Sequence, residues 1–254
     1  MLNAKTKKRI VAVVTATLFF IAMSGTAFAK VTSSSHLDYV ALGDSIPDGY
    51  GLVSGELSYP DRIAAGLADE EVLGNYDNFA ESGLTAQKLL DDLSDYTMSI
   101  RQAEIITLTV SGDDVLPLVQ RYISGDLTAL PEIAIAVADG GSVEQNLTSI
   151  MMEIKQLNKN AEIYVMGYPT AIAANPYLTA EQQAQISAGI MQLNARIADA
   201  AANAGATYID TQNIAFTDLM LDGIHLTNNG QIIAATDFWN QIDEDFVKID
   251  ALLY

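Results

Sequence analysis

Two short motifs near opposite ends of the chain carry residue types suited to acyl transfer. A Gly-Asp-Ser sequence ends at Ser45, and an acid and a histidine, Asp222 and His225, stand three residues apart near the C-terminus. A serine hydroxyl is a poor nucleophile at neutral pH, so it needs an imidazole to take its proton and a carboxylate to orient that imidazole. The only other histidine, His36, follows a polar serine-rich stretch and is expected to be solvated. The residue types therefore favour joint action of Ser45, His225 and Asp222 in nucleophilic catalysis.

The spacing of each motif also fits a purely structural role. Gly-Asp-Ser is common where a strand turns into a helix, because Asp and Ser favour turns and Gly supplies backbone freedom. Asp222 and His225 fit a solvated loop before a helix that Thr227 or Asn228 would cap. A carboxylate three residues before an imidazole can, however, reach its Nδ1 across one loop and leave Nε2 to face a serine. The catalytic interpretation thus depends on what the rest of the chain provides.

The segments between the two motifs alternate between short apolar runs and longer stretches with helical periodicity. Apolar runs typical of buried strands occupy residues 39–42, 105–110, 162–166 and 207–209. Apolar residues fall on one helical face over residues 143–157 and 186–197. Strands and helices that alternate in this way imply an α/β fold with a parallel sheet covered on both faces. Such sheets bind ligands at the carboxyl ends of their strands, which is where Ser45 would lie.

Both predicted helices have start signals. Ser142 with Gln145, and Thr179 with Gln182, have the capping-box spacing, in which a hydroxyl and an amide satisfy otherwise unpaired backbone donors. Glycine is the residue that most often follows the last turn of a helix. Gly205 therefore predicts the end of the second helix.

The chain resembles the GDSL, or SGNH, family of serine esterases and lipases at four spaced blocks. Residues 39–45 are similar to the family's first strand and nucleophile turn, and residues 222–225 match its Asp-x-x-His sequence. Residues 78–83 resemble its Asn-x-Ala-x-x-Gly turn, and residues 111–114 stand at its remaining block. The resemblance implies a three-layer α/β/α sandwich with a parallel sheet, of the flavodoxin-like kind.

The resemblance also implies a role for individual residues. Ser45 would attack an ester carbonyl, His225 would act as the general base, and Asp222 would orient His225. The backbone amide of Gly83 would donate a hydrogen bond to the oxyanion. No metal and no other cofactor is expected. An ordinary α/β-hydrolase presents its triad in the same chain order, but the Gly-x-Ser-x-Gly turn of that fold is absent here.

The remaining block departs from the family pattern. The family has Gly-x-Asn-Asp, whereas this chain has Asp113 where the asparagine amide would donate to the oxyanion. An ionised carboxylate accepts hydrogen bonds but cannot donate them, and loss of one such donor typically lowers the rate by about 10² to 10³. Three interpretations stay open. Asp113 is protonated and donates, or it turns away and leaves a slow esterase, or the fold serves as an extracellular ligand-binding protein with little turnover.

The first 29 residues are typical of a secretory signal peptide. Four basic residues precede an apolar run over residues 10–23, and an Ala-Phe-Ala sequence then ends at Ala29. An uncleaved membrane anchor is the alternative, but the run is shorter than the roughly 20 apolar residues that span a bilayer. We therefore expect a secreted, extracellular protein without a stable membrane anchor after cleavage, in which residues 30–254 form a single domain.

Composition narrows the classes of partner. The chain of 254 residues has 13 Lys and Arg, 32 Asp and Glu and a net charge of −19; removal of the four leader cations leaves nine cations and a charge of −23. Such a surface repels nucleic acid and anionic membranes. Without any cysteine, the chain has no disulfide, thiolate metal site or cysteine nucleophile. The family resemblance implies a small-molecule, lipid or polysaccharide ester as the partner.

Overall fold

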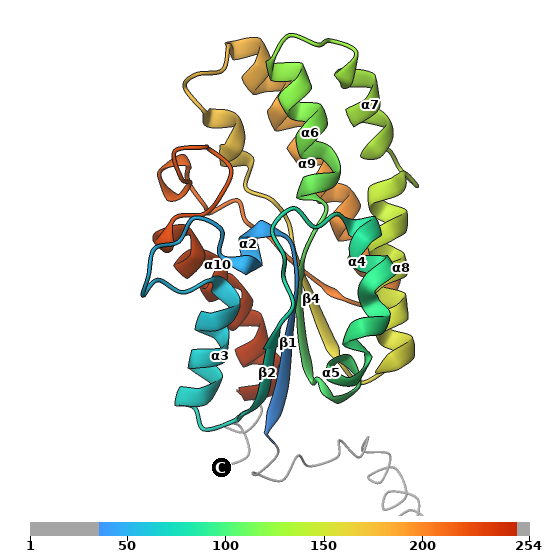
Figure 1. Cartoon of the computed structure of the whole chain (residues 1–254), viewed down its shortest axis with the longest axis vertical. Coiled ribbons are helices and arrows are strands. Elements are labelled where there is room, and N and C mark those ends of the chain that lie inside the picture. The colour runs from blue at the N-terminus through green and yellow to red at the C-terminus, as the bar shows by residue number, and fades with distance from the viewer. Residues whose placement is uncertain (1–35, 248–254) are drawn as a thin grey trace, which may run out of the picture. The chain divides into compact units, whose positions relative to one another are not determined.

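The computed structural model describes residues 36–247, which contain a parallel sheet with helices on both faces (Figure 1). The signal peptide expected at residues 1–29 lies outside this range. The strands are β1 (Leu37–Gly43), β2 (Leu73–Asn78), β3 (Ile105–Thr109), β4 (Glu162–Met166) and β5 (Thr207–Ile209). Their order across the sheet is β2-β1-β3-β4-β5, and every neighbouring pair is parallel. The predicted three-layer α/β fold is thereby confirmed.

Helices form the two outer layers. One face of the sheet carries α3 (Tyr59–Asp69) and α10 (Asn228–Ile242), which contact each other. The other face carries α4 (Ala86–Asp92), α5 (Thr97–Gln102), α8 (Ser142–Leu157) and α9 (Ala180–Ala204). Three further helices, α2 (Ser45–Asp48), α6 (Gly112–Ile123) and α7 (Ala129–Ala136), lie at or beyond the carboxyl ends of the strands. Single helical turns occupy Leu93–Tyr96, Thr170–Ala174, Phe216–Asp218 and Asp243–Val247.

The centre of the sheet is buried on both sides. Every residue of β3 is buried, as expected for a parallel strand covered by two helical layers. Its two threonines satisfy their hydroxyls within the core, since Thr107 and Thr109 each form a 2.8 Å hydrogen bond with a buried tyrosine. The register between β1 and β3 ends with Gly43 opposite Thr109. The loops that follow these two strands therefore start side by side.

The strand at the edge of the sheet was not predicted. The sequence of β2, Leu-Gly-Asn-Tyr-Asp-Asn, has no apolar run, and all of its residues are partly or fully exposed. An edge strand pairs on one side only and needs little apolar burial, so its sequence need not be hydrophobic. The four predicted strands all appear, at or within one or two residues of the expected bounds.

One predicted helix start is confirmed and the other is wrong. Thr179 caps α9 with the reciprocal bonds of a capping box to Gln182, and the left-handed Gly205 ends the helix. By contrast, the N-cap of α8 is Gly141, where a Cβ would lie 2.7 Å from the carbonyl oxygen of Ala136. Ser142 is instead the first helical residue, and no side chain caps this helix.

Candidate active site

Ser45, His225 and Asp222 form a hydrogen-bonded row at the carboxyl edge of the sheet. The Nε2 atom of His225 lies 2.9 Å from the Oγ atom of Ser45, and its Nδ1 atom lies 2.7 Å from Oδ2 of Asp222. The second carboxylate oxygen of Asp222 accepts hydrogen bonds from the backbone N–H groups of Ile224 and His225, at 2.9 and 3.1 Å. The structure thus brings the three predicted side chains together in the order serine, imidazole, carboxylate.

The electrostatics of Asp222 suit an ionised partner for an imidazole. Partial burial raises the pKa of Asp222, but the hydrogen bonds from His225 and from two backbone N–H groups outweigh burial and leave the pKa below its usual value. A hydrogen bond between Nδ1–H and an ionised carboxylate leaves Nε2 without a proton and able to accept one. The ring of His225 is therefore oriented to accept the hydroxyl proton of Ser45.

A short turn places Ser45 at the end of β1. Asp44 is the N-cap of α2, and its carboxylate accepts the backbone N–H of Ile46 at 3.0 Å. Gly43 has a φ of 145°, and a Cβ there would lie 2.1 Å from the carbonyl oxygen of Thr109. Only glycine fits this close approach of two strand ends. Ser45 therefore begins a helix, where its own N–H lies among the unpaired donors of the first turn.

The loop that holds His225 is fixed at both ends. Leu219 and Leu226 form an antiparallel bridge, and the N–H of Met220 donates to the carbonyl of His225 at 2.7 Å. Thr227 then caps α10 through its hydroxyl, as one of the two expected caps. Asp222 and His225 therefore lie in a closed turn between a bridge and a helix cap rather than in a free loop.

Gly83 lies in a loop tied to the Ser45 turn. The N–H of Glu81 donates to the carbonyl of Gly43 at 2.9 Å, and the side-chain amide of Asn78 donates to the carbonyl of Pro47 at 3.1 Å. Ser82 donates a hydrogen bond to Asp48 of α2. Gly83 itself has a φ of 88°, and its N–H donates to no atom within residues 36–247. The N–H of Gly83 is thus unpaired among the described residues and belongs to a loop that is hydrogen-bonded to the Ser45 turn.

Asp113 lies in the first turn of α6 and interacts electrostatically with His225. Partial burial raises the pKa of Asp113, the charge of His225 opposes this, and the neighbouring Asp114 raises the pKa further. The carboxylate of Asp114 already has a hydrogen-bond partner, since it accepts the N–H of Ala86 at 2.8 Å. No described residue shares a hydrogen bond with the carboxylate of Asp113. The three interpretations of Asp113 therefore stay predictions.

Tyr168, which had no predicted role, is buried and contacts the residues that precede Ser45 and Asp113. Its hydroxyl donates to the carboxylate of Asp44 and accepts the N–H of Gly112 at 2.7 Å. Asn194 fixes the backbone of Tyr168 with two hydrogen bonds of 2.8 Å. Burial raises the pKa of Asp44 to about 7, although the hydrogen bonds from Tyr168 and Ile46 act in the opposite direction. The only sequence signal was that Tyr168 comes two residues after the predicted strand at residues 162–166.

Tyr50 is a second residue that the motifs did not indicate. Its ring centroid lies 4.3 Å from that of His225, with 37° between the ring planes, and about half of the residue is exposed. The ring covers one face of the imidazole and restricts its rotation. Contacts between aromatic rings at this distance add stability beyond simple burial.

Two other properties of the described chain bear on its chemistry. Within residues 36–247, no three or more His, Cys, Asp or Glu side chains are grouped to hold a metal ion. Over the same residues, no helix has the length and apolar character needed to cross a bilayer.

Solved structures of several hydrolases have the same fold. The chain is 23% identical to an extracellular lipase from Streptomyces rimosus, with a TM-score of 0.62 and coverage of 77% of this chain and 94% of that one. A phospholipase A1 from Streptomyces albidoflavus has 22% identity, a TM-score of 0.62 and coverage of 76% and 94%. An acetyl xylan esterase from Geobacillus stearothermophilus has 19% identity, a TM-score of 0.58 and coverage of 82% and 95%. At these identities the likeness establishes the fold.

The sequence itself assigns the family. A search among curated proteins found no match. The model of the GDSL-like lipase/acylhydrolase family, however, matches residues 41–232, which include the Ser45 turn, the Gly83 loop and the loop of Asp222 and His225. Since this match spans most of the chain and agrees with the fold, the chain belongs to the GDSL-like lipase/acylhydrolase family.

Proposed function

We propose that the protein is a serine ester hydrolase that works through an acyl-serine intermediate. The observation that carries the proposal is the row from Ser45 Oγ to His225 Nε2, at 2.9 Å, and from His225 Nδ1 to Asp222, at 2.7 Å. Membership of the GDSL-like lipase/acylhydrolase family supports an ester hydrolase more broadly. Lipid acyl esters and acetylated polysaccharides are the candidate substrates, since proteins of the same fold include a phospholipase and an acetyl xylan esterase.

Each half of the reaction uses the same two groups. Ser45 Oγ forms a bond to the ester carbonyl carbon while its proton passes to Nε2 of His225, and collapse of the tetrahedral intermediate releases the alcohol, which takes that proton. Water then attacks the acyl-serine, His225 accepts its proton, and the acid leaves as the proton returns to Ser45 Oγ. Asp222 stabilises the positive imidazole in both halves.

The oxyanion is stabilised by the backbone N–H groups of Ser45 and Gly83. In this proposal Asp113 assists only when its carboxyl group is protonated, since it then donates a hydrogen bond and carries no charge. Its raised pKa and its lack of a hydrogen-bond partner within residues 36–247 support this role. When Asp113 is ionised, its charge opposes the negative charge that develops on the carbonyl oxygen.

The proposed location is extracellular. It rests on the sequence of residues 1–29, which has the basic, apolar and small-residue regions of a signal peptide. The N-terminal sequence of protein recovered from the medium of an expressing bacterium tests this proposal. A mature protein that begins at Lys30 is expected, whereas an intact leader on membrane-bound protein would overturn it.

Fluorophosphonate labelling with esterase assays tests the activity. Wild-type protein is expected to hydrolyse nitrophenyl esters and to take up one fluorophosphonate, and Ser45→Ala should lose both properties while retaining its melting temperature. Labelling that persists in Ser45→Ala would refute Ser45 as the nucleophile. Absence of turnover and labelling between pH 5 and 8 would favour the ligand-binding alternative.

A further inference from the structure

Gln231 is a buried polar residue in the first turn of α10, outside the candidate active site. Its Nε2 atom donates to the carbonyl oxygen of Ile46 at 2.9 Å, and its Oε1 atom accepts the backbone N–H of Tyr59 at 2.8 Å. A glutamine amide donates at one end and accepts at the other, so these two partners together fix its orientation. Gln231 is only 1% exposed and both partners are buried, so water does not compete for either bond.

The amide joins the helix that follows the candidate base to the helix that starts at the candidate nucleophile. Ile46 is the residue directly after Ser45 in α2, and Gln231 comes six residues after His225. The N–H of Gln231 donates to the carbonyl of Thr227, the N-cap of α10, at 2.9 Å. A short path of covalent and hydrogen bonds thus leads from His225 through the start of α10 to the Ser45 turn.

The helix that carries the candidate nucleophile depends on contacts of this kind. It spans only Ser45–Asp48, and a helix this short has little stability of its own. Tyr168 holds the residue directly before Ser45, and Gln231 holds the residue directly after it. Tyr168 lies in the segment that follows β4, whereas Gln231 lies in the helix that continues from the loop of His225. Of these two contacts, that of Gln231 therefore relates the nucleophile to its base.

A structural role as a cap of α3 explains only half of this arrangement. Tyr59 is the first residue of α3, where a backbone N–H has no partner within the helix. The N-cap residue Ser58 does not supply one, since its hydroxyl donates to Asp61. Gln231 supplies the acceptor in its place. A carboxylate would serve equally well as a cap, so the donor at Nε2 is explained by the Ser45 turn alone.

We propose that Gln231 is a positioning residue for the reaction of Ser45, an inference that rests on the proposed hydrolase function. Its amide holds the carbonyl of Ile46 and so keeps Ser45 Oγ within hydrogen-bonding distance of His225 Nε2. A misplacement of about 1 Å between reacting groups can lower a rate by about 10²-fold. Both halves of the reaction depend on the placement of Ser45 relative to His225, so loss of the amide slows both.

Gln231→Met removes the amide and keeps a side chain of similar length. We expect kcat for nitrophenyl acetate to fall about 10- to 10²-fold with little change in KM. Asn158→Leu is the matched control, since Asn158 donates to the carbonyls of Ile100 and Ala103 at 3.0 and 2.7 Å, at the edge of the sheet opposite the candidate site. This control should lower the melting temperature without changing kcat.

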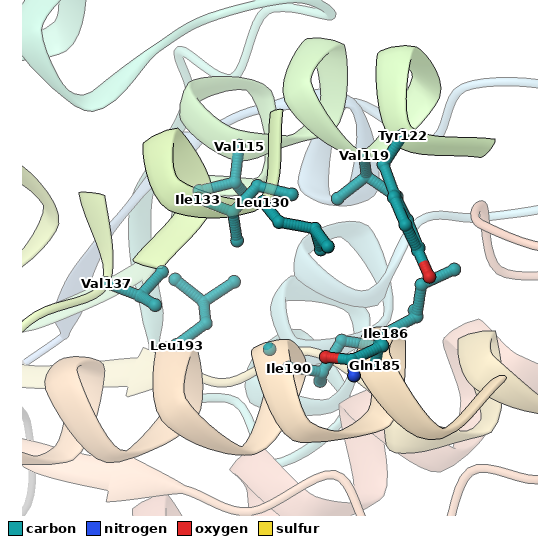
Figure 2. A pocket seen from close by; sticks show the side chains of 11 residues that line it. Val115, Val119, Tyr122, Leu130, Ile133, Val137, Gln185, Ile186, Ile190 and Leu193 are labelled. Atoms are coloured by element: carbon teal, nitrogen blue, oxygen red, sulfur yellow. The ribbon is translucent and has the colours of Figure 1, made fainter. Parts of the chain in front are cut away.

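Leu193→Ala controls for loss of stability alone. Leu193 of α9 lines an apolar cavity of about 60 Å³, into which side chains of α6 and α7 also point (Figure 2). The candidate triad does not line this cavity. Truncation enlarges the cavity, so the melting temperature should fall while kcat for nitrophenyl acetate stays at the wild-type value.

Gln231→Glu separates the two halves of the amide. The carboxyl group accepts the N–H of Tyr59 in either protonation state, but it donates to Ile46 only when protonated. This variant keeps the cap of α3 and is expected to fold. Its kcat relative to wild type should be lowest at alkaline pH, a dependence that a cap of α3 alone would not produce.

Nitrogen NMR of labelled histidine tests the position of the base without turnover. The chain has two histidines, so His36→Gln assigns both sets of signals. Ser45→Ala should shift the Nε2 resonance of His225, and Gln231→Met should shift it in the same direction, whereas Asn158→Leu should not. An unshifted resonance in folded Gln231→Met, or wild-type kcat in both Gln231 variants at alkaline pH, would overturn the positioning role. If wild-type protein hydrolyses no ester but the resonance still responds to Gln231→Met, the hydrolase proposal fails and the positioning role stands.

Discussion

The hydroxyl of Tyr168 donates a hydrogen bond to the carboxylate of Asp44, the residue directly before Ser45. The same hydroxyl accepts the N–H of Gly112, the residue directly before Asp113. One phenol group therefore joins the start of α2 to the start of α6, so the Ser45 turn and the Asp113 turn cannot move independently while both bonds exist. Because Tyr168 and Asp44 are buried, water does not readily replace either bond.

Tyr168→Phe is expected to lower both stability and turnover. The change leaves the buried carboxylate of Asp44 and the partly buried N–H of Gly112 without the Tyr168 hydroxyl, and a buried polar group without a partner typically costs about 1 to 3 kcal/mol. We expect the free energy of unfolding to fall by about 2 to 4 kcal/mol, and kcat to fall about tenfold with little change in KM. Denaturant unfolding and steady-state kinetics measure the two effects.

Tyr164→Phe provides the matched control. It removes the hydroxyl that donates to Asp245 at 2.7 Å, outside the candidate site. This variant should lose stability without loss of kcat. If both variants left kcat unchanged, Tyr168 would be a purely structural residue.

Asp44 should make stability depend on pH between about 4 and 7. Burial raises its pKa from 3.8 in the unfolded chain to about 7, so the folded protein binds the extra proton in this interval. Its contribution to stability is then complete below pH 4 and is lost as the pH rises through 7. Asp44→Asn mimics the neutral acid, so its stability relative to wild type should rise by on the order of 2 to 4 kcal/mol from pH 4 to 8. A difference that stays constant across this range, in urea unfolding at each pH, would contradict the assignment.

Asp222→Asn is expected to lower kcat by about 10³ to 10⁴ without unfolding the protein. The amide can offer its NH₂ group to Nδ1, which stabilises the imidazole tautomer that cannot accept the proton of Ser45. Asp69→Asn makes the same chemical change at an exposed site on α3 and should leave kcat unaltered. Steady-state rates at pH 7.5 measure both, and a loss below tenfold in Asp222→Asn would remove Asp222 from the triad.

Asp113→Asn is expected to raise activity at neutral and alkaline pH. Asparagine donates a hydrogen bond at every pH, whereas Asp113 donates only below its raised pKa. At pH 8 we expect a rate about 10 to 10² times that of wild type, with the ratio approaching one as the pH is lowered. A variant slower than wild type at every pH would show that the carboxylate has a role of its own.

Tyr50→Ala is expected to lower kcat/KM about three- to tenfold, and Tyr50→Phe is expected to retain the wild-type value. The ring lies against His225, and an aromatic contact of this kind contributes about 0.5 to 1.5 kcal/mol. The phenylalanine variant keeps that contact and removes only the hydroxyl. Equal losses in both variants would instead indicate a role for the hydroxyl.

Sequence patterns predicted the elements whose physical causes are local. The four apolar runs appear as strands because burial on both faces requires nearly continuous apolar residues. Thr179 caps α9 because its hydroxyl and Gln182 satisfy donors within one turn. Ser142 is not the cap, since α8 begins one residue earlier than predicted and its N-cap is Gly141, which lies close to the backbone of Ala136; the capping-box spacing does not indicate this approach.

The candidate site was predictable only in part, because some of its contacts join residues that lie far apart in the sequence. Ser45, Asp222 and His225 were found by residue type and short-range spacing, and the structure brings them into hydrogen-bonding contact. Tyr168 reaches Asp44 across 124 residues, so no spacing rule indicates this pair. Tyr50 lies near the Ser45 turn in sequence, but its contact with His225 forms only when the last loop folds against the first.

The hydrogen bond between Ser45 and His225 joins residues 180 positions apart, and α10, which follows His225, lies on the sheet face beside α3. Closing a loop of this length costs more conformational entropy than forming a local contact. The candidate nucleophile emerges early in synthesis, yet its candidate base is not in position until the loop of His225 has folded. Esterase activity would therefore report on completion of the fold, and a truncated chain that ends before residue 225 would hold Ser45 as an inert hydroxyl.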